Sequence, residues 1–470
     1  MDICVMGAGY VGLPLGVVLA VENPQTRIHV QDINAERIAK IDEGQLPFRE
    51  EGLEELFNKV RKNNFKATTD LQSIFPNCAV FILCVNTDTK SSGHGAGGAL
   101  EIKSILSCVE EIGRELLKES GSREILIVEK STVPLGTSIA IRRRLEKMLG
   151  ESWMDSIAIV SNPEFLEEGK ALQGLLKPDR IVLGFEKNKK SAIFAQKKMS
   201  EMYNYASEKI IETDCSSSEL GKLSANAFLM TKVTSINALT ELCETSGADV
   251  SELAKIIGSD YRIGPLFLRS SIGVGGYCLE KDTLCLEYLC RAKGLDQAAD
   301  YWRRLVEFNR YQKKRFALKI IEYFDNCLVG KKILVLGVSF KENSEDCRNS
   351  PAIEVIKTLL EENGAQIRIV DPHVEKKDFV KEFERTTGRI LDSNKVTFES
   401  KEVCPKKWEQ LSQEVDALLV LCGHKLFKEN EASFAKGLAE GRGALFDGRK
   451  LFDQKAMREL GIFAYSIGSA

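Results

Sequence analysis

Short apolar runs alternate with longer amphipathic stretches along the first part of the chain. The runs lie at 2–6, 27–32, 79–85, 124–132, 157–165 and 179–184. Helix-like segments, for example 100–120, separate several of them. Strands that alternate with helices in this way are typical of a mainly parallel, doubly wound sheet. We therefore expect residues 1–213 to form one α/β domain.

The pattern changes at about residue 214, where the strand-like runs stop. Apolar residues then recur at i, i+3 and i+4, which predicts an all-helical central domain at 214–325 with a long linking helix. Strand-like runs return at 331–340, 366–372, 415–422 and 443–450, and Pro351 is placed near the start of a helix. Residues 326–470 are expected to form a second, smaller Rossmann-like domain. The predicted fold class is thus α/β, with two doubly wound domains joined by a helical one.

Composition is that of a globular protein and argues against several classes of function. The chain has 470 residues, of which 43% are hydrophobic and 28% charged, and its net charge of -3 gives no basic footprint for nucleic acid. No apolar run approaches the ~20 residues of a membrane-spanning helix, and the N-terminus does not resemble a signal peptide. The 13 cysteines include no CxxC pair, which predicts reduced thiols and a cytoplasmic location. The four histidines are scattered, so we expect no metal site.

A glycine-rich loop follows the first apolar run. Gly7, Gly9 and Gly12 form GxGxxG between a predicted strand and a predicted helix, where glycines allow a tight turn and a close approach of a pyrophosphate. The helix N-terminus offers N–H groups to the phosphates. Asp32 lies 20 residues after Gly12 and is placed to accept hydrogen bonds from a ribose, which favours NAD. Arg37 keeps NADP open as an alternative.

Several segments, in order along nearly the whole chain, resemble the UDP-glucose/GDP-mannose dehydrogenase family. They include "GAGYVGLP", "VEKSTVPLGTS", "SNPEFLEEG", "ELGKLSANAFL", "GVGGYCLEKD" and "LGVSFKENSEDCRNSP". The resemblance implies an NAD domain, a helical bridge and a nucleotide-sugar domain, in that order. It also implies oxidation of a primary alcohol to a carboxylate with two NAD and one water. Within the family, the chain is most similar to members that convert UDP-glucose to UDP-glucuronate.

The resemblance implies catalytic roles for several side chains. Cys278 corresponds to the nucleophile, whose thiolate turns the aldehyde into a thiohemiacetal and then a thioester. Asp282 corresponds to the base that manages protons at the reacting carbon. Lys222 and Asn226, also four residues apart, correspond to groups that stabilise oxyanions.

Two further catalytic positions and the binding residues follow from the same resemblance. Glu164 corresponds to a proton-transfer residue of the thioester steps, and Thr132 to a residue that holds the catalytic water. The implied substrate-binding residues are Phe165, Leu166, Glu168, Lys222, Asn226, Arg262, Phe267, Gly275, Lys341 and Arg449. The implied cofactor-binding residues are Gly7, Gly9, Tyr10, Val11, Gly12, Asp32, Arg37, Glu168 and Arg348. Arg262 corresponds to an arginine that reaches a neighbouring subunit's substrate, which implies a homodimer or a higher homo-oligomer.

The cysteine loop departs from the family's usual GFGGSCFPKD or GFGGSCFQKD. Val274, Tyr277, Leu279 and Glu280 stand at the altered positions. These changes leave open a different nucleotide sugar, such as GDP-mannose or a UDP-N-acetylhexosamine, and a non-catalytic sensor of NAD or nucleotide sugar. An acidic residue beside Cys278 would disfavour a thiolate if it pointed toward the sulfur.

Overall fold

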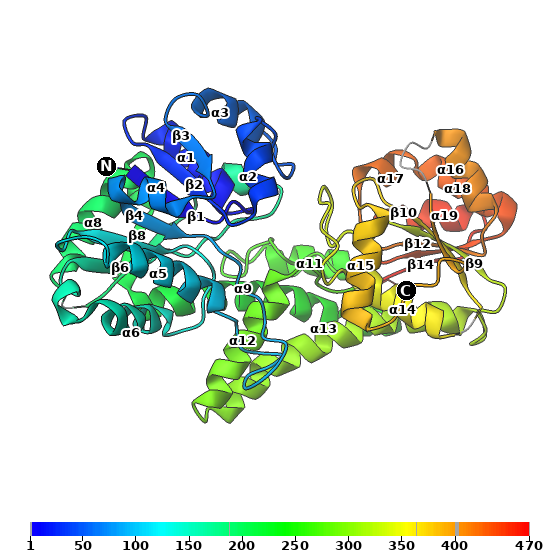
Figure 1. Ribbon diagram of the computed structural model, residues 1–470. Coiled ribbons are helices and arrows are strands. Elements are labelled where there is room, and N and C mark those ends of the chain that lie inside the picture. Colours follow the sequence, from blue (N-terminus) through cyan, green and yellow to red (C-terminus); the bar gives the residue numbers. More distant parts are fainter. Residues whose placement is uncertain (1, 188, 363, 400–403, 470) are drawn as a thin grey trace. The chain divides into compact units, whose positions relative to one another are not determined.

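The computed structural model describes residues 2–187, 189–362, 364–399 and 404–469. Its contacts divide the chain into a first unit, Met1–Ala225 with Tyr288–Gly294, and a second unit, Asn226–Glu287 with Leu295–Ala470. Each unit contains a mainly or wholly parallel sheet between helices (Figure 1). The predicted α/β class is therefore confirmed. Within the described ranges, no helix has both the length and the apolar character needed to span a bilayer.

The first unit is built on an eight-stranded sheet in the order β3-β2-β1-β4-β5-β6-β7-β8. Its strands are β1 (Asp2–Met6), β2 (Ile28–Gln31), β3 (Phe65–Thr68), β4 (Cys78–Leu83), β5 (Ile125–Glu129), β6 (Ile157–Ser161), β7 (Ile181–Phe185) and β8 (Ile210–Asp214). Neighbours are parallel except β6 and β7. Every residue of β1, β2, β5 and β6 is buried, as expected for parallel strands covered on both faces.

Helices bury apolar stripes against both faces of this sheet (Figure 1). One face is covered by α1 (Gly12–Glu22), α2 (Ala35–Asp42), α3 (Leu53–Val60), α7 (Ala171–Leu176) and α8 (Ser191–Met202). The other is covered by α4 (Leu71–Ile74), α5 (Lys103–Leu116) and α6 (Thr137–Leu149). In α5 the buried residues Ile105, Val109, Ile112 and Leu116 recur at helical spacing, which explains why this stretch docks as a helix.

The middle of the chain is helical but contains one long irregular segment. The helices are α9 (Cys215–Ala238), α10 (Thr240–Ser246), α11 (Val250–Gly258), α12 (Cys278–Ala292) and α13 (Asp296–Tyr323). The expectation of an all-helical region is wrong for residues 259–277, where Gly264 precedes a proline and Gly264, Gly273 and Gly276 all have positive φ. The division between the two units falls within α9 and α12, whereas α13 belongs to the second unit. The three-domain limits at 213/214 and 325/326 stay predictions.

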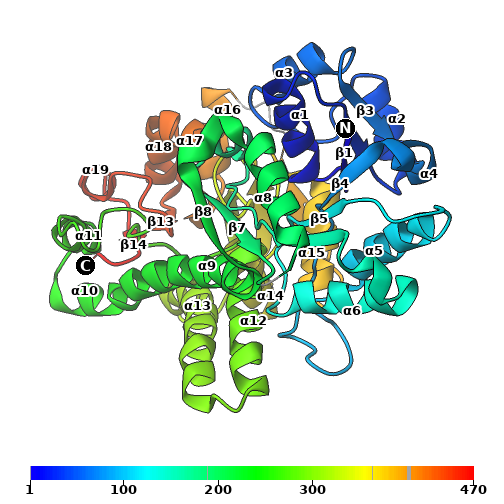
Figure 2. The ribbon, with the colours of Figure 1, turned by 90° about the vertical axis from the view of Figure 1, so that its left-hand side faces the viewer.

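The second unit has a six-stranded parallel sheet in the order β11-β10-β9-β12-β13-β14. Its strands are β9 (Lys332–Leu336), β10 (Gln366–Val370), β11 (Val396–Phe398), β12 (Ala417–Val420), β13 (Ala444–Asp447) and β14 (Ala464–Ser466). On one face lie α13, α14 (Pro351–Glu361) and α15 (Lys376–Thr387). On the other lie α16 (Pro405–Gln413), α17 (Lys425–Glu429), α18 (Glu431–Gly441) and α19 (Gln454–Glu459) (Figure 2).

Candidate active site

The glycine-rich loop of the first unit has the shape of a phosphate cradle. Gly7 has φ of 107°, and a methyl group there would lie 2.5 Å from the Cys84 carbonyl oxygen. A methyl group on Gly12, the first residue of α1, would collide with the Gly7 carbonyl oxygen. Above Gly9, by contrast, no atom lies within 4 Å of where a methyl group would be. The loop is thus tightly packed on its inner side and open where a pyrophosphate would approach the backbone, so these residues fit a dinucleotide.

Asp32, directly after β2, holds this loop in place. One of its carboxylate oxygens accepts a hydrogen bond from the Ala8 N–H at 2.8 Å, and the other from the Asn34 N–H at 2.9 Å. The Arg37 guanidinium donates to the same carboxylate at 2.9 Å. Carboxylate oxygens accept more than one hydrogen bond each, so Asp32 can still receive a ribose hydroxyl. Arg37 is held beside Asp32 and partly screens its charge.

The other predicted cofactor residues lie in less confined places. Tyr10 is exposed and its ring centroid lies 4.3 Å from that of Phe48. Val11 is half-buried at the N-terminus of α1. Glu168 is half-buried in the loop between β6 and α7. The predicted cofactor role of these three residues is not tested.

Glu164 and Lys222 form a buried ion pair in the first unit. The Lys222 ammonium, from α9, lies 3.0 Å from one Glu164 oxygen, and the Leu166 N–H donates to the other at 2.6 Å. Burial alone would raise the Glu164 pKa, but the Lys222 charge and these hydrogen bonds outweigh it and lower that pKa. Lys222 and Arg180 also lie over the Phe165 ring, at 5.3 and 3.9 Å from its centroid. The predicted catalytic residues Glu164 and Lys222 therefore lie beside two predicted substrate residues, Phe165 and Leu166.

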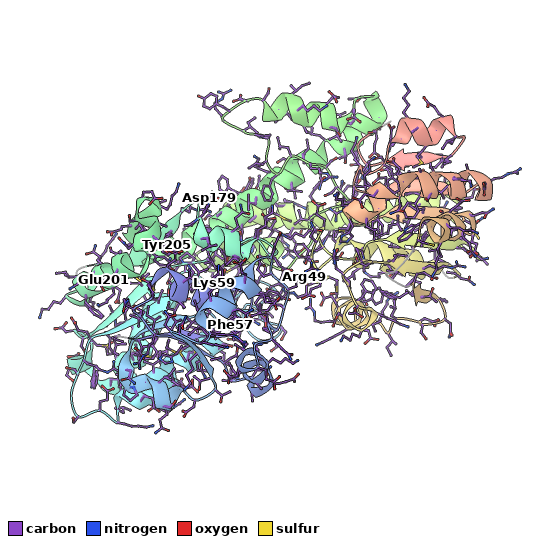
Figure 3. All side chains as sticks on the ribbon, turned by 90° about the horizontal axis from the view of Figure 1, so that it is seen from above. Arg49, Phe57, Lys59, Asp179, Glu201 and Tyr205 are labelled. Carbon is purple, nitrogen blue, oxygen red and sulfur yellow. The ribbon has the colours of Figure 1, made fainter. Side chains whose placement is uncertain are left out.

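A pocket of about 80 Å³ opens behind this pair. Glu164 and Phe165 line one side, and the segment with Asp179 lines another. Tyr205 also lines the pocket, and Figure 3 labels both Asp179 and Tyr205 on the first unit. Thr132 lies in the adjacent loop, buried, where its carbonyl accepts a hydrogen bond from the Thr87 hydroxyl at 2.5 Å.

Cys278 is the first residue of α12 and is exposed. The positive end of a helix dipole favours negative charge at this position. One turn later, Asp282 is fully buried, and its carboxylate accepts a hydrogen bond of 2.6 Å from the Asn226 side chain. Lys281 places its ammonium 3.5 Å from the other Asp282 oxygen. The second unit therefore brings three of the predicted catalytic residues into one local arrangement, while Lys222 and Glu164 belong to the first.

Glu280 does not act as an unbalanced charge beside the cysteine. Its carboxylate accepts two hydrogen bonds from Arg310, at 3.1 and 2.7 Å, and one from Asn349 at 3.1 Å. Lys313 lies 4.0 Å away. Burial alone would raise the Glu280 pKa, but the charges of Lys313 and Arg310 and the hydrogen bonds lower it. These two cations of α13 compensate the negative charge that distinguishes this loop.

Tyr277, next to the cysteine, is flanked by two cations. The Lys281 ammonium lies 5.3 Å from its ring centroid and the Arg348 guanidinium 5.4 Å from it. Arg348 in turn binds Asp346 through two guanidinium nitrogens, at 2.8 and 2.6 Å. The Arg348 carbonyl accepts a hydrogen bond of 3.1 Å from the Gly276 N–H. Tyr277 thus ties the cysteine loop to the segment that contains the predicted cofactor residue Arg348.

Three predicted substrate residues, Gly275, Lys341 and Arg449, belong to the second unit. A methyl group on Gly275 would lie 2.6 Å from Pro351 and 2.9 Å from the Phe340 side chain, which explains the glycine. Lys341 places its ammonium 5.7 Å from the Phe340 ring centroid. Arg449 donates from Nε to the Leu421 carbonyl at 2.7 Å, while its buried Nη2 has no hydrogen-bond partner among the described residues. Such an orphaned donor is suited to an anionic or carbonyl group of a ligand.

Arg262 and Phe267 are not brought to the other predicted residues. Arg262 is exposed and, in the described part of the chain, forms its polar contacts with Asp260 alone. Phe267 is also exposed and has φ of 63°, a left-handed conformation that costs free energy in a non-glycine residue. Their predicted role in substrate binding stays a prediction.

A buried polar cluster lies at the end of the second sheet, and sequence reasoning did not identify it. Asp371, after β10, accepts hydrogen bonds from the backbone N–H groups of Val338 and Ser339, at 2.7 and 3.0 Å. The His424 imidazole lies 2.9 Å from the Ser339 hydroxyl and 3.5 Å from Asp371. Burial opposes the imidazolium, but Asp371 and Cys422 raise the His424 pKa to about 9.

Other residues near the site were also missed. Lys130, Asn162 and Tyr203 lie behind Glu164, and Arg310 and Lys313 lie beside Glu280. Lys130 directly precedes the "STVP" segment from which only Thr132 was taken, so its position was the available signal. The cations beside Glu280 lie 30 or more residues away in sequence and give no local signal.

Comparisons with known proteins extend over the whole chain. Three domain models of the UDP-glucose/GDP-mannose dehydrogenase family match this chain. The model of the NAD binding domain matches residues 1–207, that of the central domain 216–311 and that of the UDP binding domain 334–454. A UDP-glucose 6-dehydrogenase from Caenorhabditis elegans is 36% identical, covering 100% of this chain and 95% of that protein. UDP-glucose 6-dehydrogenase 5 from Oryza sativa is 38% identical, covering 100% and 97%.

Solved structures show the same fold. A UDP-glucose dehydrogenase from Pyrobaculum islandicum matches with a TM-score of 0.82 and 25% identity, covering 100% of this chain and 98% of that one. A UDP-D-ManNAc dehydrogenase from Pyrococcus horikoshii matches with a TM-score of 0.80 at 23% identity, covering 100% and 99%. The family models account for all three parts of the chain, and the first of them is the family's NAD binding domain. The chain belongs to the UDP-glucose/GDP-mannose dehydrogenase family.

Proposed function

We propose that this chain catalyses the NAD-dependent oxidation of the C6 alcohol of UDP-glucose to the carboxylate of UDP-glucuronate. The observation that carries the proposal is the exposed Cys278 at the start of α12, with the buried Asp282–Asn226 pair one turn away. A cysteine nucleophile is what separates a four-electron oxidation from a simple alcohol dehydrogenase. The relatives named UDP-glucose 6-dehydrogenase match over the whole chain and support the substrate.

In the first oxidation, Asp282 receives the proton of the C6 hydroxyl, directly or through water, and the carbon loses a hydride. Asn226 holds Asp282 in position through the 2.6 Å hydrogen bond. NAD, when bound in the cradle formed by Gly7, Gly9 and Gly12, supplies the hydride acceptor for each of the two oxidations. The product is an aldehyde, which must be retained.

In the second oxidation, the Cys278 thiolate adds to the aldehyde carbon and forms a thiohemiacetal. Loss of a second hydride converts it into a thioester, and water then releases the acid with Glu164 as the proton acceptor. Lys222 and Asn226 stabilise the negative charge on oxygen in these steps. The balance is one UDP-glucose, two NAD⁺ and one water giving one UDP-glucuronate, two NADH and three protons.

A different nucleotide sugar, such as GDP-mannose or a UDP-N-acetylhexosamine, is the second candidate. Tyr277 supports it, because a bulky ring flanked by Lys281 and Arg348 stands where the family usually has serine. The full-length relatives named UDP-glucose 6-dehydrogenase favour a uridine nucleotide over a guanosine one.

Several wider features belong to the same proposal. The chain is organised as NAD-binding, central helical and UDP-sugar-binding parts, and it works as a homodimer or a higher homo-oligomer in which Arg262 reaches a neighbouring subunit's substrate. Arg348 contacts the cofactor, and Lys341 and Arg449 contact the nucleotide sugar. Among these residues, the unpartnered Nη2 of Arg449 is the feature most suited to a ligand.

The test is the ratio of NADH formed to sugar consumed, measured with purified protein and a panel of UDP- and GDP-sugars. Two NADH per UDP-glucose are expected. Cys278→Ser should stop the reaction before the acid, with a loss of at least about 10³-fold in overall turnover. Cys327→Ser is the matched control, because Cys327 is also exposed and should leave turnover unchanged. Turnover on another sugar alone would replace the substrate, and NAD binding without any turnover would indicate a sensor.

A further inference from the structure

Behind Glu164, the first unit contains a second buried amine that the reaction scheme does not use. The Lys130 ammonium, just after β5, donates to the Asn162 side-chain oxygen at 3.1 Å and lies 3.4 Å from the Tyr203 hydroxyl. That hydroxyl donates to the same Asn162 oxygen at 2.7 Å. Lys130, Asn162 and Tyr203 are all buried. A buried ammonium costs several kcal/mol unless charges or hydrogen bonds compensate it.

Lys130 shares the pocket with Glu164 and is joined to it through the backbone. The Glu164 N–H donates to the Lys130 carbonyl at 3.3 Å, and the Asn162 N–H donates to the Glu129 carbonyl at 2.9 Å. Lys130 and Glu164 both line the pocket described above. In this arrangement Asn162 and Tyr203 contribute neutral oxygens, so the carboxylate of Glu164 is the negative charge available on this side of the pocket.

The two amines near Glu164 have different tasks in the proposed reaction. Lys222 binds the Glu164 carboxylate at 3.0 Å, yet the same ammonium is needed for the oxyanion of the reacting carbon. When Lys222 turns to that oxyanion, Glu164 loses its ion-pair partner in a buried environment. A carboxylate left in this way would take up a proton and stop acting as a base.

We propose that Lys130 is a positioning residue for Glu164: its fixed ammonium keeps the Glu164 carboxylate ionised and in place while Lys222 serves the reacting carbon. The inference rests on the proposed function, because it concerns the hydrolysis of the Cys278 thioester. The Asn162 and Tyr203 oxygens hold the ammonium at the back of the pocket, where it does not compete with Lys222. Burial lowers the Lys130 pKa to about 8, against the opposing influence of Cys84 and Glu164, so the amine is mostly charged below that pH.

Other groups also influence the two side chains, and the experiment must hold them constant. The charged and titratable groups around Lys130 and Glu164 are Cys84, Lys177, Asp179, Arg180, Tyr203, Tyr205 and Lys222. Substitutions at Lys130 and Asn162 leave all of these in place.

The experiment measures the pH dependence of the second oxidation and hydrolysis, with the C6 aldehyde of UDP-glucose as the substrate. Lys130→Met should raise the Glu164 pKa, so the acid limb of the kcat profile should move upward by about one pH unit. At a pH on that limb, turnover should fall by about tenfold, with the KM for this aldehyde changed less than about twofold. The thioester on Cys278 should accumulate, which intact-mass measurement after acid quenching detects.

Three further variants separate charge from packing. Lys130→Arg keeps the charge and should keep the acid limb within about half a pH unit of its original place. Asn162→Asp opposes the Lys130 charge without removing the amine and should move the limb upward as Lys130→Met does; it also serves if Lys130→Met does not fold. Tyr205→Phe keeps every charge and removes a pocket hydroxyl that donates to the Leu175 carbonyl at 3.0 Å, so it is the matched control, with an unmoved limb.

Each result decides between the possibilities. An unmoved limb in a folded Lys130→Met, or an unmoved limb in Asn162→Asp, overturns the proposal. Equal losses in Lys130→Met and Lys130→Arg with the same fall in melting temperature would show a purely structural role. The unsubstituted protein is assayed first. If it does not form two NADH per UDP-glucose, the proposed function and this inference both fail, whereas normal turnover with an unmoved limb refutes the inference alone.

Discussion

Gly7 and Gly337 follow the first strand of their respective sheets and occupy equivalent places. Gly7 has φ of 107° and lies against the backbone of Cys84, just after β4. Gly337 has φ of 82°, and a methyl group there would lie 2.5 Å from the Cys422 side chain, just after β12. In each sheet, an aspartate after the neighbouring strand accepts hydrogen bonds from the backbone just beyond that glycine.

Beyond this shared turn, the two sheets differ in what covers the aspartate. In the first, α1 begins at Gly12, Gly9 is open, and Asp32 keeps the partly exposed Arg37 as its charged neighbour. In the second, Ser339 and His424 close over Asp371, and the next helix starts only at Pro351. The same turn therefore leaves the Gly9 backbone open in the first sheet and borders a buried polar cluster in the second. We expect the residues around each turn to decide whether it receives a ligand.

The largest expected difference between the two sheets is in their aspartates. Asp371→Ala leaves four backbone N–H groups without an acceptor and removes the carboxylate beside the buried His424, so the free energy of unfolding should fall by about 3–5 kcal/mol. Asp32→Ala removes two backbone hydrogen bonds and should cost about 1–3 kcal/mol, but it should raise the KM for NAD. Urea unfolding and NAD titration of both variants measure this. Equal loss of stability with unchanged KM for NAD would contradict the comparison.

Glycine substitutions should also lower stability in the second sheet and NAD binding in the first, with a somewhat smaller loss of stability than the aspartate substitutions. Gly337→Ala forces a left-handed residue into contact with Cys422 and should lower the free energy of unfolding by about 2–4 kcal/mol. Gly9→Ala meets open space, so the melting temperature should hold while the added methyl group weakens NAD binding by about tenfold or more. Calorimetry and fluorescence titration with NAD report the two quantities. Tight NAD binding by Gly9→Ala would show that the cradle lies elsewhere.

The smallest effect concerns pH and the second sheet alone. Burial opposes ionisation of His424, but Asp371 and Cys422 raise its pKa to about 9 from the usual 6.5. A raised pKa of this kind stabilises the fold below pH 6.5 and loses that contribution as the pH rises toward 9. Between pH 6.5 and 8 the loss should be about 2 kcal/mol, and it should disappear in His424→Asn. Urea unfolding of both proteins across this range is the measurement; parallel curves would refute the assignment.

Much of the fold was predictable from sequence because buried parallel strands are continuous apolar runs. β1, β5 and β6 are fully buried and lie within predicted runs. β3 and β8 were missed, and both lie at the edges of the first sheet, where strands are partly exposed and carry polar residues. The irregular segment 259–277 was included in the helical prediction because the segments on either side of it have helical spacing, although it contains Pro265 and several glycines.

The candidate site was predictable where it follows a motif and not where it depends on long-range pairing. GxGxxG and Asp32 were found because three glycines and one acid have a fixed spacing. The roles of Cys278 and Asp282 came from the resemblance alone. The charge of Glu280 is compensated by residues of α13, and the Lys130 cluster depends on Asn162, directly after β6, and Tyr203, directly after α8. Such contacts between distant segments leave no periodic or local trace in the sequence.

The distribution of thiols has a consequence for handling a reactive aldehyde. Of the 13 cysteines, the exposed ones are Cys278, Cys327 and Cys404. Burial raises the pKa of the Cys78 and Cys84 thiols to about 12, so both are protonated and unreactive near neutral pH. In the proposed reaction, which passes through an aldehyde, such buried thiols would not be modified by it. Burial of its thiols thus gives a cysteine-rich protein chemoselectivity without reducing the number of its cysteines.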